Sequence, residues 1–217
     1  MPFPLTHLLV ADELLKRRPK TEAGVFLLGS IAPDAVHYRK NASTEQEGLG
    51  PTKKITHLCP VSDEKWGYVT DNEGWIESIR AFNQKTHHHP LYKGYAAHCL
   101  TDLYNNMTLW TIFRTNHPKE AAKGYKSDYY KDLNNIDQRL FKDMETDHIW
   151  DQLKKSTPQD MPGLVTAQEI HDIRDNILYE QYKTPDENPN QDYHFLTYEE
   201  SLGFIQKAAD FIEEILQ

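Results

Sequence analysis

Apolar residues recur along most of this chain at the spacing of helices, and that pattern limits what the chain can fold into. On a helix, residues three or four positions apart share one face. Leu8, Ala11 and Leu15 follow this spacing near the start of the chain, and similar patterns predict helices over residues 22–30, 73–85, 91–114, 127–155, 166–182 and 198–216. No stretch alternates polar and apolar residues for the length of a useful strand. We therefore expect an all-α fold, an irregular multi-helix bundle.

Polar and helix-breaking residues predict where these helices begin and end. Thr6 and Asn72 have side chains that cap helix N-termini, and we expect them to begin the first and third helices. The second helix should stop before Pro33, because the residue ahead of a proline disfavours helical backbone. Residues 39–56 and 184–192 are polar and contain several breakers, so they predict irregular connections. With no internal repeat and no clear linker, residues 1–217 are expected to form a single domain.

The composition excludes several classes of partner. The chain carries 24 Lys and Arg against 33 Asp and Glu, a net charge of −9. An acidic surface repels phosphate groups, so we expect no binding to duplex nucleic acid and no stable association with membranes. No secretory signal and no bilayer-length apolar run is visible, and we expect a cytoplasmic protein of open oligomeric state. Two cysteines, Cys59 and Cys99, are too few for a disulfide scaffold and are interpreted as small buried apolar residues.

The segment His98-Cys-Leu-Thr-Asp102 gives the strongest local signal among the eleven histidines of the chain. Four residues apart on a helix, the imidazole of His98 and the carboxylate of Asp102 lie one above the other and can bind one cation. Both are ligands of zinc and related divalent metals. The helix around them is apolar, so this face should point inward, where an unpaired His and Asp are costly. The alternative is a hydrogen-bonded His–Asp pair inside a core.

Three residues in other segments carry the same ligand types. His7 precedes an apolar stretch on the first predicted helix, Asp34 follows Pro33 at a helix end, and His57 comes directly after the polar loop. Each also has a structural interpretation, as a core histidine, a turn cap and a surface residue respectively. Taken with the His98–Asp102 pair, these residues predict a metal centre.

The order of these ligands and the residues around them resembles the zinc-dependent phospholipase C family of all-helical metallohydrolases, which is related to the S1/P1-type single-strand nucleases. The matching segments are Thr6-His7-Leu8, Phe26-Leu-Leu-Gly-Ser-Ile-Ala-Pro-Asp34, Thr56-His57-Leu58 and Gly94-Tyr-Ala-Ala-His98-Cys-Leu-Thr-Asp102. They cover about the first half of the chain, and they are specific as an ordered set rather than singly. The resemblance implies a helical fold of the phospholipase C/P1 nuclease type and phosphoester hydrolysis at a metal cluster.

The resemblance also implies a role for each candidate ligand. His57, His98 and Asp102 would surround one metal, with Asp34 beside them as a ligand or as the catalytic base. His7 would bind a second metal, and Asp102 would bridge the two ions.

The chain departs from the family pattern in two places. Its N-terminus is Met-Pro rather than an exposed aromatic residue, and no later His…His-x-x-x-Glu set stands at the expected spacing. We therefore expect one or two divalent ions rather than three, with zinc first and Mn, Fe or Ni as alternatives.

Further polar residues near the predicted ligands are candidates for the same site. Possible ligands, or partners of ligands, are His37, His88 and His89. Consecutive histidines point in different directions on a helix, so one of the run at 87–89 could face the site, and all three rarely would. Basic residues expected to contact phosphate oxygens are Arg39, Lys53 and Lys54. The remaining histidines, expected at the surface, are His117, His148, His171 and His194.

Together these observations predict a metal-dependent phosphoesterase that uses metal-activated water. We expect Asp34 to orient or deprotonate that water, and the substrate to be a small soluble phosphodiester or phosphomonoester rather than bulk phospholipid. One alternative is a non-catalytic metal-binding helical protein, a sensor or a lapsed hydrolase. Another is a purely structural protein whose histidines are core hydrogen-bonders. The role of residues 115–217 beyond the helical core stays open.

Overall fold

The computed structural model describes residues 3–39, 53–60, 64–86, 89–184 and 191–216, and within these ranges the chain is helical and contains no strand. The helices are α1 (Pro4–Arg17), α2 (Ala23–Gly29), the 3-10 helix η1 (Ala32–Tyr38), α4 (Asn72–Lys85), α5 (Pro90–Met107), α6 (Leu109–Asn116), α7 (Pro118–Ala121), η2 (Gly124–Lys126), α8 (Asp128–Asp143), α9 (Asp147–Lys155), α10 (Ala167–Asn176), the π-helix η3 (Ile177–Gln181) and α11 (Tyr198–Ile215). The all-α prediction is confirmed.

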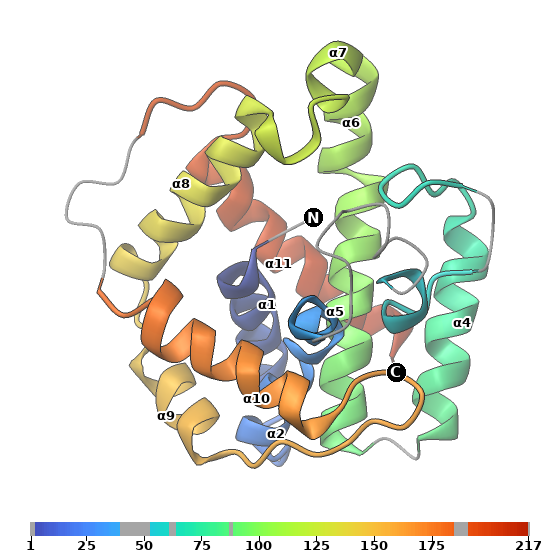
Figure 1. Ribbon diagram of the computed structural model, residues 1–217, viewed down its shortest axis with the longest axis vertical. Coiled ribbons are helices and arrows are strands. Elements are labelled where there is room, and N and C mark those ends of the chain that lie inside the picture. Colours follow the sequence, from blue (N-terminus) through green and yellow to red (C-terminus); the bar gives the residue numbers. More distant parts are fainter. Residues whose placement is uncertain (1–2, 40–52, 61–63, 87–88, 185–190, 217) are drawn as a thin grey trace.

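Helix α5 is the centre of the arrangement. It runs through the middle of the molecule, where α1, α2, α4 and α11 all pack against it (Figure 1). Gly94 on α5 lies against the backbone of Phe26 on α2, and Gly29 lies against the backbone of Leu91, so closely that a Cβ on either glycine would collide with a carbonyl oxygen. Glycine is required at both positions because only the missing Cβ lets the two backbones touch. This contact places the end of α2, and η1 directly after it, over the middle of α5.

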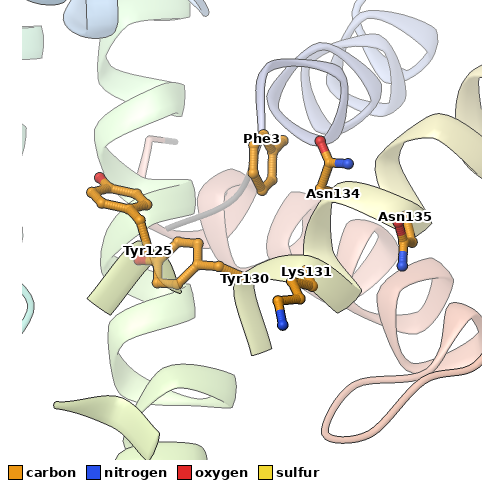
Figure 2. Close-up of a pocket in the computed structure, with 6 residues that line it drawn as sticks. All are labelled: Phe3, Tyr125, Tyr130, Lys131, Asn134 and Asn135. Atoms are coloured by element: carbon orange, nitrogen blue, oxygen red, sulfur yellow. The ribbon is translucent and has the colours of Figure 1, made fainter. Parts of the chain in front are cut away.

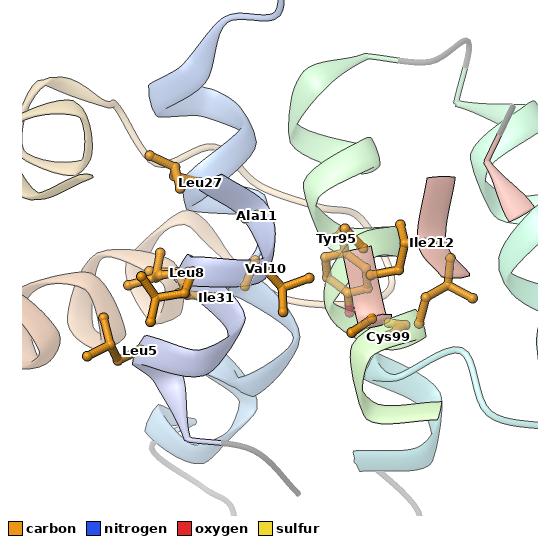
Figure 3. Close-up of a cluster of buried hydrophobic side chains, with 14 of the residues drawn as sticks. Leu5, Leu8, Val10, Ala11, Leu27, Ile31, Tyr95, Cys99 and Ile212 are labelled. Atoms are coloured by element: carbon orange, nitrogen blue, oxygen red, sulfur yellow. The ribbon is translucent and has the colours of Figure 1, made fainter. Parts of the chain in front are cut away.

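The hydrophobic core joins the two halves of the chain. Figure 3 shows Leu5 and Leu8 of α1, Tyr95 and Cys99 of α5 and Ile212 of α11 in one buried cluster. Farther along the chain, α9 packs on α2, and α10 packs on η1. The C-terminal helices therefore hold in place the N-terminal elements that carry the candidate ligands.

Both cysteines are free thiols in this core, with Cys59 6% and Cys99 0% exposed. Burial raises the pKa of Cys59 to about 12 and also raises the pKa of Cys99. The interpretation of both as small buried apolar residues is confirmed. No helix of the described residues is long and apolar enough to cross a bilayer.

Two predicted helix starts are wrong, the first by three residues and the second by one. Helix α1 begins at Pro4, so Thr6 lies inside it. Proline suits the first turn because its fixed φ is helical and its missing N–H would have no partner there. Helix α4 is capped by Asp71, whose carboxylate accepts a hydrogen bond from the N–H of Gly74, rather than by Asn72.

Two predicted long helices are broken. The predicted helix over 91–114 is interrupted at Thr108 (φ −116°, ψ −97°), which separates α5 from α6. The Thr108 hydroxyl donates to the carbonyl of Tyr104 at 2.6 Å, a local bond that competes with regular helix. The pattern over 127–155 likewise divides into α8 and α9 at residues 144–146.

The backbone also differs from expectation in two further places, after Pro33 and in the predicted loop over residues 39–56. The chain stays helical beyond Pro33, in the 3-10 form of η1, so Asp34 and His37 share one turn. Of the predicted loop, residues 53–56 are helical, and residues 40–52 lie outside the described part of the chain.

Candidate metal centre

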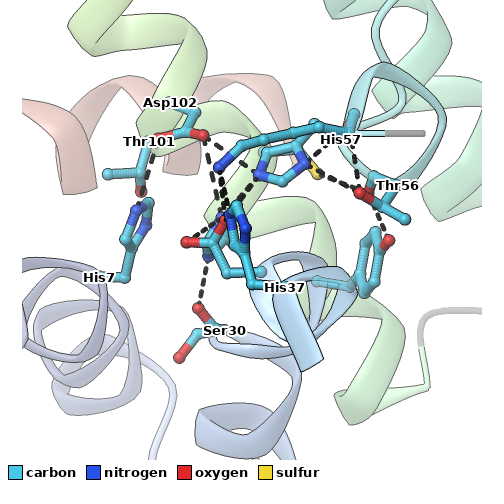
Figure 4. Close-up of polar contacts among 12 residues, drawn as sticks. His7, Ser30, His37, Thr56, His57, Thr101 and Asp102 are labelled. Carbon is cyan, nitrogen blue, oxygen red and sulfur yellow. Dashed lines mark hydrogen bonds and ion pairs between the residues drawn. The ribbon is translucent and has the colours of Figure 1, made fainter. Parts of the chain in front are cut away.

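The five predicted ligands come together beside α5, and Figure 4 shows His7, His57 and Asp102 among them. His7 extends from α1, Asp34 from η1, His57 from the residue after the helical turn 53–56, and His98 and Asp102 from α5. The three histidines and Asp102 are at most 2% exposed. The Asp34 side chain is 19% exposed, so this carboxylate stands on the open side of the cluster.

Two of the imidazoles are held by backbone carbonyl groups. The Nδ1 atom of His98 lies 2.7 Å from the carbonyl oxygen of Ser30, and that of His57 lies 2.9 Å from the carbonyl oxygen of Lys53. A carbonyl oxygen can only accept, so in each ring Nδ1 carries the proton. The Nε2 atoms of His57 and His98 therefore present lone pairs, which is how a second hydrogen bond orients a metal-ligating histidine.

These lone pairs face other acceptors. The two Nε2 atoms lie 3.3 Å apart, and His57 Nε2 lies 3.4 Å from Oδ2 of Asp102. Burial, with the adjacent His7, lowers the pKa of His98 to about 3, and burial with the nearby Lys53 ammonium lowers the pKa of His57. Both rings are neutral at pH 7, so no imidazolium proton separates the acceptors. Such an arrangement is stabilised by a cation.

Asp102 and His7 are buried polar side chains without a hydrogen-bond partner among the described residues. The Nε2 atom of His7 lies 3.4 Å from Oδ1 of Asp102, beyond the usual hydrogen-bond length. The His7 ring stacks on His98 with 3.8 Å between the centroids and 8° between the planes. Buried polar atoms are almost always paired, so these orphaned atoms indicate a ligand that they bind together.

Asp34 is an ionised carboxylate held next to a buried lysine. Its Oδ1 lies 2.8 Å from Nζ of Lys53 and 3.3 Å from Nε2 of His57, and its Oδ2 lies 3.9 Å from Nε2 of His98. Burial alone raises the pKa of Asp34, but the charge of the Lys53 ammonium outweighs burial and holds that pKa well below its usual range. Asp34 is therefore charged at neutral pH.

Lys53 and His37 complete the open side of the cluster. The Lys53 side chain is 7% exposed, and its ammonium donates to Nε2 of His37 at 3.2 Å as well as to Asp34. His37 itself is 39% exposed and stands at the rim. Sequence reasoning placed Lys53 on a loop as a phosphate contact, whereas the structure puts it in direct contact with a candidate ligand.

Trp66 is a neighbour of the site that sequence reasoning missed. Its ring packs edge-on against His57, with 4.9 Å between centroids, and lies 5.5 Å from the Lys53 ammonium. Trp75 supports the same segment, since its Nε1 donates to the carbonyl oxygen of His57 at 2.8 Å. Trp66 belongs to no periodic pattern, so only the tertiary fold shows its position.

Several predicted site residues are not brought to the cluster. Arg39 is paired with the carboxylate of Glu169, 2.7 Å from Nε, and Lys54 donates to the carbonyl oxygen of Glu64. His89 is exposed and caps α5. It lies about 13 Å from His98 along that helix, because each residue adds only 1.5 Å. Arg39, Lys54 and His89 are close to ligands in the sequence, but their side chains contact other parts of the fold.

The other histidine predictions divide in two. His88 lies outside the described residues. The four histidines expected at the surface, His117, His148, His171 and His194, are all exposed, and this prediction is confirmed.

The donor set fits a divalent metal. Two groups of three residues, His57–His98–Asp102 and His7–Asp34–His98, have ligand atoms that all lie within 4.8 Å of one another. Zinc bonds of 2.0–2.1 Å in a tetrahedral site place neighbouring donors about 3.4 Å apart. The separations of 3.3 and 3.4 Å from His57 Nε2 to His98 and Asp102 match that spacing.

A cavity of about 500 Å³ is lined by Phe3, Tyr125, Tyr130, Lys131, Asn134 and Asn135 (Figure 2), and none of the candidate ligands lines it. Phe3 precedes α1, one turn before His7.

Comparison with known proteins identified no relative: no protein-family model, no curated protein and no solved structure matches the chain.

Proposed function

We propose that this protein is a metal-dependent phosphoesterase with an all-helical fold of the phospholipase C/P1 nuclease type. One observation carries the proposal: two neutral imidazoles converge through lone pairs with a buried carboxylate that has no hydrogen-bond partner among the described residues, and a second carboxylate stands on their open side. Neutral histidines with carboxylates are the ligands of hydrolytic zinc sites.

In this proposal His57, His98 and Asp102 hold the ion. A bound divalent ion lowers the pKa of its water towards 7 and polarises phosphoryl oxygens. Asp34 is ionised, faces the open side and accepts the proton of the attacking water, a role for which a charged carboxylate is needed. Because its own pKa is low, Asp34 can act as a base only towards water whose pKa a bound ion would already have lowered.

Lys53 binds the phosphate in the same proposal. An ammonium has three protons, and Asp34 and His37 engage two of them within the described residues. The third is directed to a non-bridging oxygen of the substrate, as a charge-assisted hydrogen bond. The cavity of about 500 Å³ at Phe3 and Tyr125 has the size of a small-ligand pocket, since such pockets span roughly 300–1,000 Å³. We therefore propose a small soluble phosphodiester or phosphomonoester.

The test begins with elemental analysis of untagged protein, where at least one equivalent of divalent metal is expected. Hydrolysis of a chromogenic phosphodiester and monoester is then measured with added Zn, Mn, Fe or Ni. Asp34→Asn should lower kcat by about 100-fold or more, the usual contribution of a general base. The matched control is Asp12→Asn, which removes another buried carboxylate beside a histidine, His148, outside the cluster. Equal activity in Asp34→Asn and wild type would contradict the proposed reaction.

A second candidate function is metal binding without catalysis. Structural metal sites are closed, whereas catalytic sites keep a position open. The burial of His57, His98 and Asp102, none more than 1% exposed, favours this alternative. Bound metal together with no hydrolysis of either chromogenic ester under any of the four metals would support it.

A further inference from the structure

The two possible ligand groups compete for one atom. Both groups include His98, whose Nδ1 is engaged by the carbonyl oxygen of Ser30 at 2.7 Å. His98 therefore offers only Nε2, and this one lone pair binds one ion. An ion at His57–His98–Asp102 therefore takes His98, and a second ion would depend on the remaining members of the other group, His7 and Asp34.

The geometry favours the first of the two groups. The Nε2 atom of His57 lies 3.3 Å from that of His98 and 3.4 Å from Oδ2 of Asp102, the spacing of donors around a single small cation. In the other group, Asp34 is already in an ion pair with Lys53 at 2.8 Å. Asp102 has no such partner within the described residues, since neither of its oxygens accepts a hydrogen bond.

Lys53 is a fixed positive charge at the place where a second metal would bind. Its side chain is 7% exposed, so its ammonium does not move freely into solvent. It also contacts His37 at 3.2 Å and lies over the ring of Trp66, which hold it against Asp34 from two sides. A divalent ion on Asp34 would be repelled by this charge at close range.

We propose that the centre binds a single divalent ion, on His57, His98 and Asp102, and that the Lys53 ammonium takes the place of a second metal at Asp34. This inference rests on the proposed function to the extent that both require a bound ion. It makes Lys53 the residue that sets the metal count, in addition to its contact with the substrate.

Metal counting on the full-length protein tests the inference. Metal-free wild type, Lys53→Met and Lys53→Arg are each titrated with Mn²⁺ and Zn²⁺, with bound metal measured by calorimetry and by elemental analysis after gel filtration. We expect one equivalent in wild type and in Lys53→Arg, and two in Lys53→Met, which keeps the length of the side chain but lacks the charge. Mn²⁺ electron paramagnetic resonance should show a spin-coupled pair in Lys53→Met alone. Lys54→Met is the control and should bind one equivalent.

Each outcome decides a different point. Two equivalents in wild type, or one equivalent of unchanged affinity in a folded Lys53→Met, would overturn the single-ion inference and leave the phosphoesterase proposal standing. Zero equivalents in wild type would overturn both. Circular dichroism shows whether Lys53→Met has folded. If it has not, Lys53→Arg still tests the role of the charge, because two equivalents of metal in Lys53→Arg would contradict the inference.

Discussion

Replacing Asp102 by Asn removes one charge from the most buried carboxylate of the centre with little change of shape. Neither oxygen of Asp102 accepts a hydrogen bond within the described residues, and the residue is 1% exposed. An unsatisfied buried polar group costs about 1–3 kcal/mol, and more when charged. An Asn amide can instead donate to Nε2 of His57, now 3.4 Å from Oδ2. In chelator, the variant should therefore be more stable than wild type by about 1–3 kcal/mol, or about 3–10 °C in Tm for a domain of this size.

Metal should reverse this order. An ion that binds only the folded state at 100 times its Kd adds about 2.7 kcal/mol of stability. Wild type should thus gain about 5–10 °C in Tm with saturating Zn²⁺. The Asp102→Asn variant lacks a charged ligand and should gain much less. Thermal unfolding followed by circular dichroism, in chelator and in metal, measures both differences on the same two proteins.

Asp12→Asn is the control for this experiment. The Asp12 carboxylate is similarly buried but is paired with His148 at 2.8 Å and Lys16 at 3.0 Å. Its replacement should lower Tm in both buffers and leave the gain from metal unchanged. A lower Tm of Asp102→Asn than of wild type in chelator would refute the reasoning, because it would mean that the Asp102 carboxylate already has a stabilising partner in the metal-free protein.

Three further predictions concern other parts of the fold. Gly94→Leu should destabilise the protein by about 3 kcal/mol and weaken metal binding, since a side chain there collides with the backbone of α2; urea unfolding and metal titration measure the two effects. Burial raises the pKa of Asp137 to about 7, so the unfolded chain loses this proton first and stability should fall by up to about 4 kcal/mol from pH 4 to pH 7. Asp137→Asn should remove that part of the slope in urea unfolding across this range, and an unchanged slope would contradict the assignment. Lys53→Ala should raise KM for a chromogenic phosphoester about tenfold through loss of one charged hydrogen bond, while Lys54→Ala and Arg39→Ala leave KM and kcat unchanged; steady-state kinetics on all three separates these roles.

Sequence reasoning predicted the helices well and their ends less well. Each helix buries one face, so its apolar residues recur every three or four positions. This spacing is visible in the sequences of α1, α4, α10 and α11. The break at Thr108 was missed because a hydroxyl that bonds to a carbonyl four residues back leaves no mark on that periodicity. The start of α1 was misplaced because proline and threonine are both plausible at a helix N-terminus.

Residue types and their spacing were sufficient to identify the candidate ligands. They were not sufficient to predict which side chains surround those ligands. His98 and Asp102 share a helix face through local geometry alone, so their spacing was sufficient to pair them. Lys53 and Lys54 are neighbours in sequence with similar chemistry, yet only Lys53 contacts Asp34. Nothing along the chain distinguishes the two, because the difference is set by the direction in which one helical turn faces the cluster.

Periodicity and residue type are local properties, and they were sufficient to predict that this chain is helical and that its candidate ligands are His7, Asp34, His57, His98 and Asp102. Which nitrogen His98 and His57 can offer depends instead on tertiary contacts, with the carbonyl groups of Ser30 and Lys53. So does the ion pair of Lys53 with Asp34, while Asp102 has no hydrogen-bond partner in the part of the chain that the structure describes. Both follow from contacts between segments far apart in the chain, held by the close approach of α2 to α5, and such contacts exist only once the core has formed.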